Sequence, residues 1–192
     1  EGVTSAVDVG GRQGYFASKL ADHYNITVEV IDSHQDDWNA DPRVLFRNGT
    51  VGVYDGTVGV RSRSRIIPLP VADLYLYLSV LHHIPNPIAV LEATPAPHLI
   101  VEAAVPDQGW MRGRHEVNQR AAETIRWLSE HARLVGYTPQ GRPLYHVDRT
   151  TTPPVPALSG TTVTPPLLHI LWLGPNTPPK SWVAEWERLN PH

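Results

Sequence analysis

Three glycines and two aspartates near the start of the chain have the types and spacing of a nucleotide-binding site. Gly10, Gly11 and Gly14 follow a short apolar stretch, and Asp8 stands just before them. Glycine lets the backbone adopt positive φ or approach a ligand closely. Asp32 ends the next apolar stretch, about 20 residues beyond the turn, where an acid accepts hydrogen bonds from ribose hydroxyls. This spacing indicates a site for a nucleotide-like cofactor.

These residues require a strand that ends in a tight turn and continues into a helix. Val7 and Val9 are β-branched and suit a parallel strand that is buried on both faces. Phe16, Leu20 and Tyr24 then recur at helical spacing. A strand that turns through glycines into a helix presents backbone N–H groups and the positive end of the helix dipole to a ligand.

The dinucleotide-binding motif G-x-G-x-x-G does not fit this turn. Counted from Gly10, it needs two further glycines where the chain has Arg12 and Tyr15. The pattern Asp8-x-Gly10-x-x-x-Gly14 instead resembles the first motif of class I S-adenosylmethionine-dependent methyltransferases. Arg12 departs from that family, which usually has its middle glycine there. A side chain at this point either crowds the cofactor or lines its carboxylate.

A second stretch carries the same resemblance. The segment Ser79-Val80-Leu81-His82-His83-Ile84 ends the apolar stretch 74–80 and is similar to the fourth-strand motif of these methyltransferases. Residues at the end of that strand lie at the ligand crevice of a doubly wound sheet. His83 and His82 are candidate general bases for a hydroxyl acceptor, because histidine titrates near neutrality. The alternative is that the pair only shapes the turn. Ser79 is a candidate cofactor contact.

The resemblance covers residues 6–148 and implies an α/β fold. That fold is a doubly wound, mostly parallel seven-stranded sheet of the Rossmann-like methyltransferase type, with an antiparallel last strand. Apolar periodicity predicts further strands at 27–31, 43–47, 74–80, 98–105, 137–138 and 144–147, and helices at 88–93 and at 115–134, the second stopped by Gly136.

A hairpin is expected between the third and fourth strands of this sheet. It consists of Val51–Tyr54, a two-residue turn at Asp55 and Gly56, and Thr57–Val60. In the resembled family an acid in this region lies near the adenine, so Asp55 is a candidate cofactor contact; the alternative is that it only forms the turn.

Three arginines follow the hairpin. Arg61, Arg63 and Arg65 alternate, which predicts one face of a single extended segment. We expect a solvated edge there, with a phosphate contact as the alternative.

Composition changes after the first domain, 1–149. Residues 150–166 are rich in threonine and proline and are expected to form an extended linker. In 167–192, the pattern His-x-x-Trp-x-Gly from His169, followed by Pro-Pro and Trp-x-x-x-Trp, resembles the start of glycosyltransferases with a DXD sugar-binding region. The DXD acids themselves are missing, so we expect no sugar transfer. The alternative is an extension that packs its tryptophans on the first domain.

Composition excludes several classes. The 192 residues include no cysteine, which excludes a disulfide framework and a thiolate metal site. A net charge of −3 predicts no nucleic-acid partner. No apolar run approaches the roughly 20 residues of a membrane span. No His-x-x-x-His pair suggests a metal, and we expect none. We expect a cytoplasmic location, and the oligomeric state stays open.

Together these patterns predict an S-adenosylmethionine-dependent methyltransferase fused to a glycosyltransferase. The fusion favours O-methylation of a glycan or glycosylated acceptor, with another small-molecule acceptor as the broader class. One alternative is an inactive domain that keeps the fold as a scaffold or assembly module. A nicotinamide-dependent oxidoreductase is disfavoured by the missing glycines.

Overall fold

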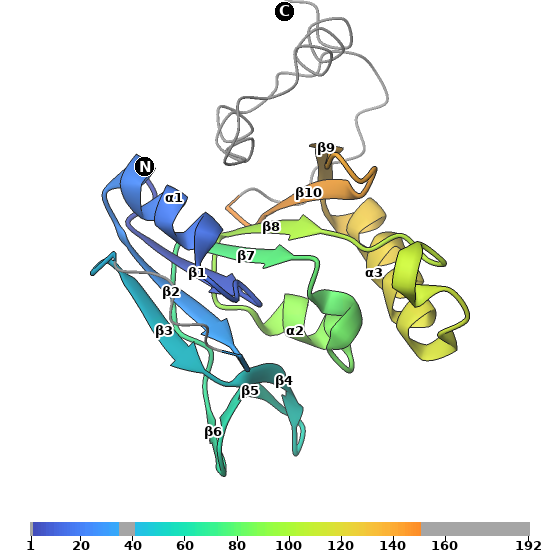
Figure 1. Ribbon diagram of the computed structural model, residues 1–192, viewed down its shortest axis with the longest axis horizontal. Helices are drawn as coiled ribbons and strands as arrows, with labels where there is room; N and C mark the ends of the chain where they lie inside the picture. The colour runs from blue at the N-terminus through green and yellow to red at the C-terminus, as the bar shows by residue number, and fades with distance from the viewer. Residues whose placement is uncertain (1, 35–40, 151–192) are drawn as a thin grey trace, which may run out of the picture. The chain divides into compact units, whose positions relative to one another are not determined.

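The computed structural model describes residues 2–34 and 41–150, which fold around one large twisted sheet (Figure 1). The sheet has the spatial order β3-β2-β1-β7-β8-β10-β9, with bounds β1 Ser5–Val9, β2 Thr27–Asp32, β3 Val44–Asn48, β7 Leu74–Leu78, β8 His98–Glu102, β9 Arg133–Tyr137 and β10 Pro143–Asp148. Within this sheet β10 runs opposite to the other six strands, because it pairs antiparallel with both β8 and β9 while all other pairs are parallel. The predicted seven-stranded, mostly parallel α/β fold is confirmed.

Helices cover both faces of the sheet. The helical elements are α1 Tyr15–Tyr24, α2 Pro87–Ala93, α3 His115–His131 and the short 3-10 turns η1 Leu81–His83 and η2 Gly109–Met111. Side chains alternate along a strand, so Val7 and Val9 belong to the core that contains Val90 of α2 and Leu128 of α3. The other face is covered by α1, which packs on β1 and β2.

The order of the strands reverses at β1. The chain goes from β1 to β2 on one side, and β7 later pairs on the other side, so Val9 faces both Ile31 and Tyr77. In open α/β sheets, ligands bind outside the carboxyl ends of the strands at such a switch point. The glycine turn after β1 and the turn after β7 therefore lie together at this switch point, where a doubly wound sheet has its ligand crevice.

A second, three-stranded sheet links β3 to β7. This meander consists of β4 Thr50–Tyr54, β5 Thr57–Ser62 and β6 Arg65–Ile67. Its predicted hairpin is confirmed, with Asp55 at φ +51° and Gly56 at φ +79° in the two-residue turn. Positive φ at both positions matches the twist of the flanking strands.

The predicted helix 115–134 is wrong at its end. The helix α3 stops at His131, Ala132 is extended, and Arg133 already belongs to β9. Gly136, predicted to stop the helix, lies inside that strand opposite Leu144. Pairing with β10 outweighs the local helical periodicity here, because propensity is a weak prior against tertiary contacts.

The strand predicted at 98–105 is β8, which ends at Glu102, and the one predicted at 137–138 is β9, which begins at Arg133 and ends at Tyr137. Two further strand predictions also need correction. The segment 61–65 is not a single extended stretch, because Arg63 has φ +55° and a turn separates β5 from β6. The strand predicted at 74–80 ends at Leu78, since Ser79 has φ +57° and leaves the sheet. In both cases a non-glycine residue in the left-handed region ends the strand, which β-propensity does not reveal.

The predicted extension 167–192, and the linker beyond Thr150, lie outside the described residues. Within 2–34 and 41–150, no helix is both long and apolar enough to cross a membrane.

Candidate functional site

The turn after β1 needs glycine at Gly10 and Gly11 for different reasons. Gly10 has φ +75°, and a Cβ there would lie 2.7 Å from the Cγ2 atom of Val80. A Cβ on Gly11 would lie only 2.3 Å from the Oδ2 atom of Asp8. The turn is thus packed against the end of β7 on one side and against the Asp8 carboxyl group on the other. Gly10 and Gly11 lie in the turn after β1, Asp8 lies inside that strand, and Val80 follows β7.

Asp8 is a buried acid with an unsatisfied oxygen. The residue is 1% exposed, and its Oδ2 atom has no hydrogen-bond partner. Burial, and to a smaller extent the charge of Asp32, raise the pKa of the Asp8 carboxyl group to about 7. A buried acceptor without a partner is costly and marks a functional candidate. Asp8 therefore has the capacity to accept a cationic or N–H group from a ligand.

Asp32 joins the glycine turn to the loop that follows β2. Its Oδ2 atom accepts a hydrogen bond from the backbone N–H of Arg12 at 2.9 Å, and Oδ1 accepts one from the N–H of His34 at 2.8 Å. Each carboxylate oxygen has a second lone pair. Asp32 can therefore hold the turn in place and still accept hydroxyl groups from a ligand.

Arg12 departs from the glycine motif without distorting the turn. Its backbone has φ +45°, the conformation that favours glycine at this position, and its side chain is exposed. Gly14, at φ +72°, then leads into α1 and accepts a hydrogen bond from the Ser18 hydroxyl at 2.9 Å. The prediction that an arginine crowds or lines the cofactor site stays a prediction.

The two histidines after β7 differ in accessibility. His82 is buried and His83 is exposed, with their ring centroids 4.2 Å apart in η1. Burial, with the nearby charges of His83, Arg142 and Arg120, lowers the pKa of His82 to about 4. The pKa of His83 is lowered too, mainly by burial. Both rings are then neutral at pH 7, and His83 is the accessible candidate base.

Sequence reasoning missed an ion-pair network that holds the turn after β7. Arg142, in the loop before β10, donates to the Ser79 hydroxyl and to Glu102 Oε1, the latter at 3.0 Å. Arg120 of α3 donates to the carbonyl oxygens of His82 and His83, both at 3.4 Å. The network joins β7, β8, β10 and α3. No local signal reveals it, since Arg142 is far from Ser79 in the chain.

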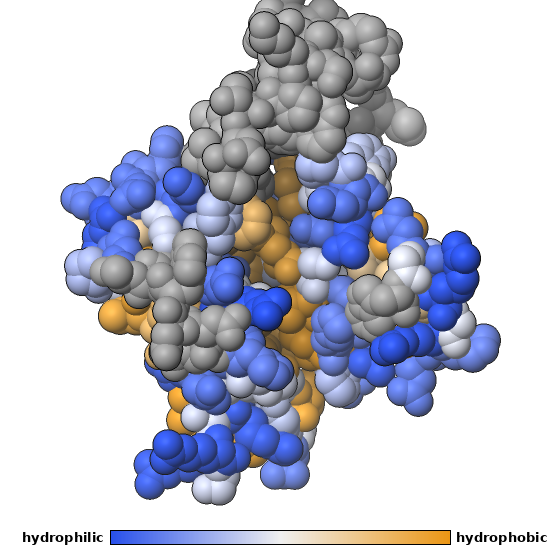
Figure 2. Space-filling model, in the orientation of Figure 1, coloured by the Kyte–Doolittle hydropathy of each residue, from blue (hydrophilic) through white to orange (hydrophobic). Residues whose placement is uncertain are grey.

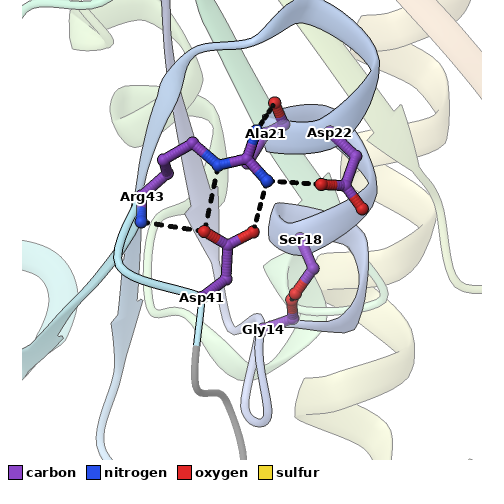
Figure 3. Close-up of polar contacts among 6 residues, drawn as sticks. All are labelled: Gly14, Ser18, Ala21, Asp22, Asp41 and Arg43. Atoms are coloured by element: carbon purple, nitrogen blue, oxygen red, sulfur yellow. Dashed lines mark hydrogen bonds and ion pairs between the residues drawn. The ribbon is translucent and has the colours of Figure 1, made fainter.

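A second network fixes α1 beside the start of β3 (Figure 3). The Arg43 guanidinium donates to both carboxylate oxygens of Asp41, to Asp22 and to the carbonyl oxygen of Ala21. The hydrogen bonds from Arg43 hold the pKa of Asp41 below its ordinary value. This clamp sets the position of the helix whose N-terminus faces the crevice.

Asp55 is placed apart from the other predicted site residues. It is exposed in the turn between β4 and β5. Gly49, whose N–H bonds the carbonyl oxygen of Asp32 at 2.8 Å, lies at the opposite end of β4. At roughly 3.3 Å per residue, the length of β4 separates Asp55 from Gly49 and Asp32. The geometry fits the turn role of Asp55, and the adenine contact stays a prediction.

The described residues contain no group of three or more His, Asp or Glu side chains that could hold a metal ion. Two histidines are set apart by the sheet itself. His83 follows the carboxyl end of β7, whereas His98 begins the neighbouring parallel strand β8. The two histidines therefore lie at opposite ends of these two adjacent strands.

Comparisons with known proteins give structural likeness only. No family model matches the sequence, and no curated protein matches it. Solved structures with a similar fold include an rRNA methylase from Escherichia coli (14% identity, TM-score 0.46, 77% of this chain and 58% of that one). An O-methyltransferase family 2 protein from Planctomyces limnophilus in complex with apigenin is also similar (15% identity, TM-score 0.45, 77% of this chain and 51% of that one). A third is the methyltransferase CalO6 (19% identity, TM-score 0.42, 74% of this chain and 56% of that one). The chain spans little more than half the length of these structures.

Proposed function

We propose that this domain is an S-adenosylmethionine-dependent methyltransferase. The observation that carries the proposal is the Asp8 carboxyl group, buried with an unsatisfied oxygen beneath a glycine turn at the switch point of the sheet. Asp32 lies at the carboxyl end of the adjacent strand, as a ribose-binding acid requires. The residues present fit a nucleoside cofactor with a cationic amino acid end.

Each residue of the site has a proposed role toward that cofactor. Asp8 balances its ammonium group, Gly10 to Gly14 allow close approach, and Asp32 binds the ribose. Ser79, held by Arg142, lines the crevice from the end of β7. When bound, S-adenosylmethionine supplies a methyl group on a sulfonium centre, so the protein mainly has to orient the acceptor and exclude water.

His83 is the proposed base when the acceptor is a hydroxyl group. It is exposed, it lies at the end of β7, and its lowered pKa keeps the ring neutral at pH 7. As the acceptor oxygen bonds the methyl carbon, the carbon–sulfur bond breaks and S-adenosylhomocysteine leaves. The hydroxyl proton passes to the imidazole ring of His83. His82 is buried and has a pKa of about 4, so it is the weaker candidate.

The acceptor class is proposed from the sequence of 167–192. The resemblance of that segment to the start of a sugar glycosyltransferase supports a glycan or glycosylated product as the methyl acceptor. A panel of free sugars, glycosides and the matching aglycones, assayed by release of S-adenosylhomocysteine, tests this class. Equal turnover of a glycoside and its aglycone would contradict the glycan assignment while leaving methyl transfer intact.

One observation favours the alternative of an inactive scaffold. Both carboxylate oxygens of Asp32 already accept backbone N–H groups, from Arg12 and His34. In a scaffold these bonds would be the whole role of Asp32, and no cofactor would bind. Cofactor binding therefore separates the two functions.

Calorimetric titration with S-adenosylhomocysteine, with NAD as the control ligand, tests the proposal. If the ligand ammonium needs an ionised Asp8 with a pKa of about 7, affinity rises about tenfold between pH 6 and pH 8. Asp8→Asn abolishes that pH dependence and weakens binding, whereas Asp55→Asn keeps the pH dependence of the wild type. A folded protein that binds neither ligand would refute the methyltransferase proposal, and binding of NAD alone would redirect it to an oxidoreductase.

A further inference from the structure

The prolines that follow η1 remove backbone donors for the carbonyl groups of His82 and His83. Bonds of the 3-10 type close η1, and the next bond of this pattern would run to the His82 carbonyl oxygen from residue 85. That residue is Pro85, which has no N–H. An α-helical bond to the His83 carbonyl oxygen would come from Pro87, which has none either. A donor from another element of the fold has to take their place.

Arg120 of α3 supplies that donor, because α3 packs against η1. Its Nη1 atom donates to both carbonyl oxygens, of His82 and of His83, at 3.4 Å each, and its Nη2 atom donates to Glu116 Oε2 at 3.2 Å. The two carbonyl bonds are long, so the guanidinium holds the turn as much by its charge as by hydrogen-bond geometry. One cation thus bridges the main chain of two successive histidines.

Arg120 is directed inward on a helix whose outer surface is polar. Figure 2 shows mostly hydrophilic side chains over the side of the molecule where Figure 1 places α3. The side chain of Arg120 is only 22% exposed, whereas that of Glu116 is 90% exposed. An ion pair with so exposed a partner contributes little to stability. The pair with Glu116 therefore does not account for the inward position of Arg120, and the contact with η1 does.

The same guanidinium changes the electrostatic surroundings of the two rings. Burial lowers the pKa of His83 most, followed by the charges of Arg120 and of Arg114 at the start of α3. Burial also lowers the pKa of His82, together with the charges of His83, Arg142 and Arg120. A nearby positive charge disfavours the protonated imidazole. Of these three arginines, Arg120 is the one that also bonds the main chain of both histidines.

We propose that Arg120 is a positioning residue for the base, which holds the turn after β7 through two carbonyl groups and sets the charge beside the His83 ring. This rests on the proposed function, in which His83 takes the proton of a hydroxyl acceptor. A base works when it is unprotonated and directed at the acceptor, and Arg120 serves both requirements. Its donors are directed at the main chain of η1, so it acts through His83 and not on the acceptor.

An NMR titration of the histidine rings in the full chain, without ligand, tests the effect of the charge. The signal of His83 is identified by its loss in His83→Ala. Arg120→Gln should raise the pKa of His83 toward its ordinary value of 6.5, and Arg120→Lys should return it to that of the wild type. The matched control, Arg126→Gln, removes an exposed arginine from the same helix and leaves the pKa of His83 unchanged.

Steady-state kinetics separate position from charge. With the most rapidly methylated acceptor of the sugar and glycoside panel, we expect Arg120→Gln to lower kcat about tenfold and to change KM less than about twofold. At pH 8 His83 is unprotonated in every variant, so a loss that remains there is one of position. Arg120→Lys keeps the charge but lacks the planar guanidinium, and we expect about a fivefold loss of kcat at that pH. Urea unfolding shows that each variant is folded.

Two outcomes would overturn the role of Arg120. One is a His83 pKa that is the same in Arg120→Gln and in the Arg126→Gln control, and the other is a kcat at pH 8 that neither Arg120 variant lowers. Both can be observed in a protein that transfers methyl groups. A protein in which the pKa of His83 responds as expected, but which neither binds S-adenosylhomocysteine nor transfers methyl groups, refutes the proposed function instead and leaves Arg120 as the residue that holds the turn.

Discussion

Replacing the buried Asp8 by asparagine should stabilise the protein at alkaline pH and not at acidic pH. The folded state raises the pKa of this carboxyl group from its ordinary value of 3.8 to about 7. The folded protein therefore keeps the proton over a pH range in which the unfolded chain loses it. Stability is fully present below pH 3.8, falls as pH rises through that range and levels off above pH 7.

The size of the effect follows from the two pKa values. One pKa unit corresponds to about 1.4 kcal/mol, so the rise from 3.8 to about 7 makes the ionised folded state about 4 kcal/mol less stable. Part of this loss has occurred by pH 5, which leaves about 2.5 kcal/mol between pH 5 and pH 8. That is a large share of the 5–15 kcal/mol by which domains are usually stable.

Urea unfolding of wild type and Asp8→Asn at pH 5 and pH 8, without ligand, measures this difference. We expect the variant to gain about 2.5 kcal/mol on the wild type between the two pH values. The control is Asp55→Asn, which removes an exposed carboxylate and leaves a turn that asparagine also forms. If the Asp8→Asn difference were the same at both pH values, Asp8 would not be the titrating group, and the argument from its burial would fail.

Three further predictions concern the parts that surround Asp8. Gly11→Ala should cost about 2 kcal/mol in urea unfolding, because its Cβ meets Asp8 Oδ2 at 2.3 Å, whereas Gly2→Ala, with nothing within 4 Å, should cost almost nothing. Arg142→Ala should cost about 2 kcal/mol, since it leaves the Glu102 carboxylate, 15% exposed, without its cation; a double-mutant cycle with Glu102→Ala that shows no coupling would contradict this. His83→Ala should lower transfer to a hydroxyl acceptor by about 100-fold with stability unchanged, and the wild-type rate should rise with pH through a midpoint below 6.5, because the pKa of His83 is lowered from that value. A rate that falls with pH across that range would exclude His83 as the base.

The features that sequence reasoning found are those determined by neighbours in the chain. The glycine turn, the hairpin at Asp55 and Gly56 and the helix after Gly14 each depend on the backbone preferences of a few adjacent residues. Motif order then placed the turns after β1 and β7 at one crevice, because a doubly wound sheet brings the carboxyl ends of those strands together. Local chemistry and known topology were sufficient for these parts.

The features it missed depend on contacts between distant segments. Arg142 meets Ser79 and Glu102 only after β10 has paired with β8, and nothing in the sequence near Arg142 indicates either partner. The end of α3 was misplaced for the same reason, since β9 exists because β10 pairs with it. Burial of His82 and exposure of its neighbour His83 likewise follow from how η1 packs against α3.

Arg12 shows how a local rule and a distant contact combine. A non-glycine residue in the left-handed region costs about 1–2 kcal/mol, and Arg12 lies there at φ +45°. Its N–H donates to the Asp32 carboxylate, and a hydrogen bond to a charged group contributes about 1.5–3 kcal/mol, which is enough to offset that cost. The departure from the glycine motif is therefore tolerated because Asp32 is present. Asp32 consequently has two roles, holding the turn and facing the crevice, and its loss would disturb the turn as well as any ribose contact. This is why Asp8, whose Oδ2 atom supports no other group, is the sharper probe of the site.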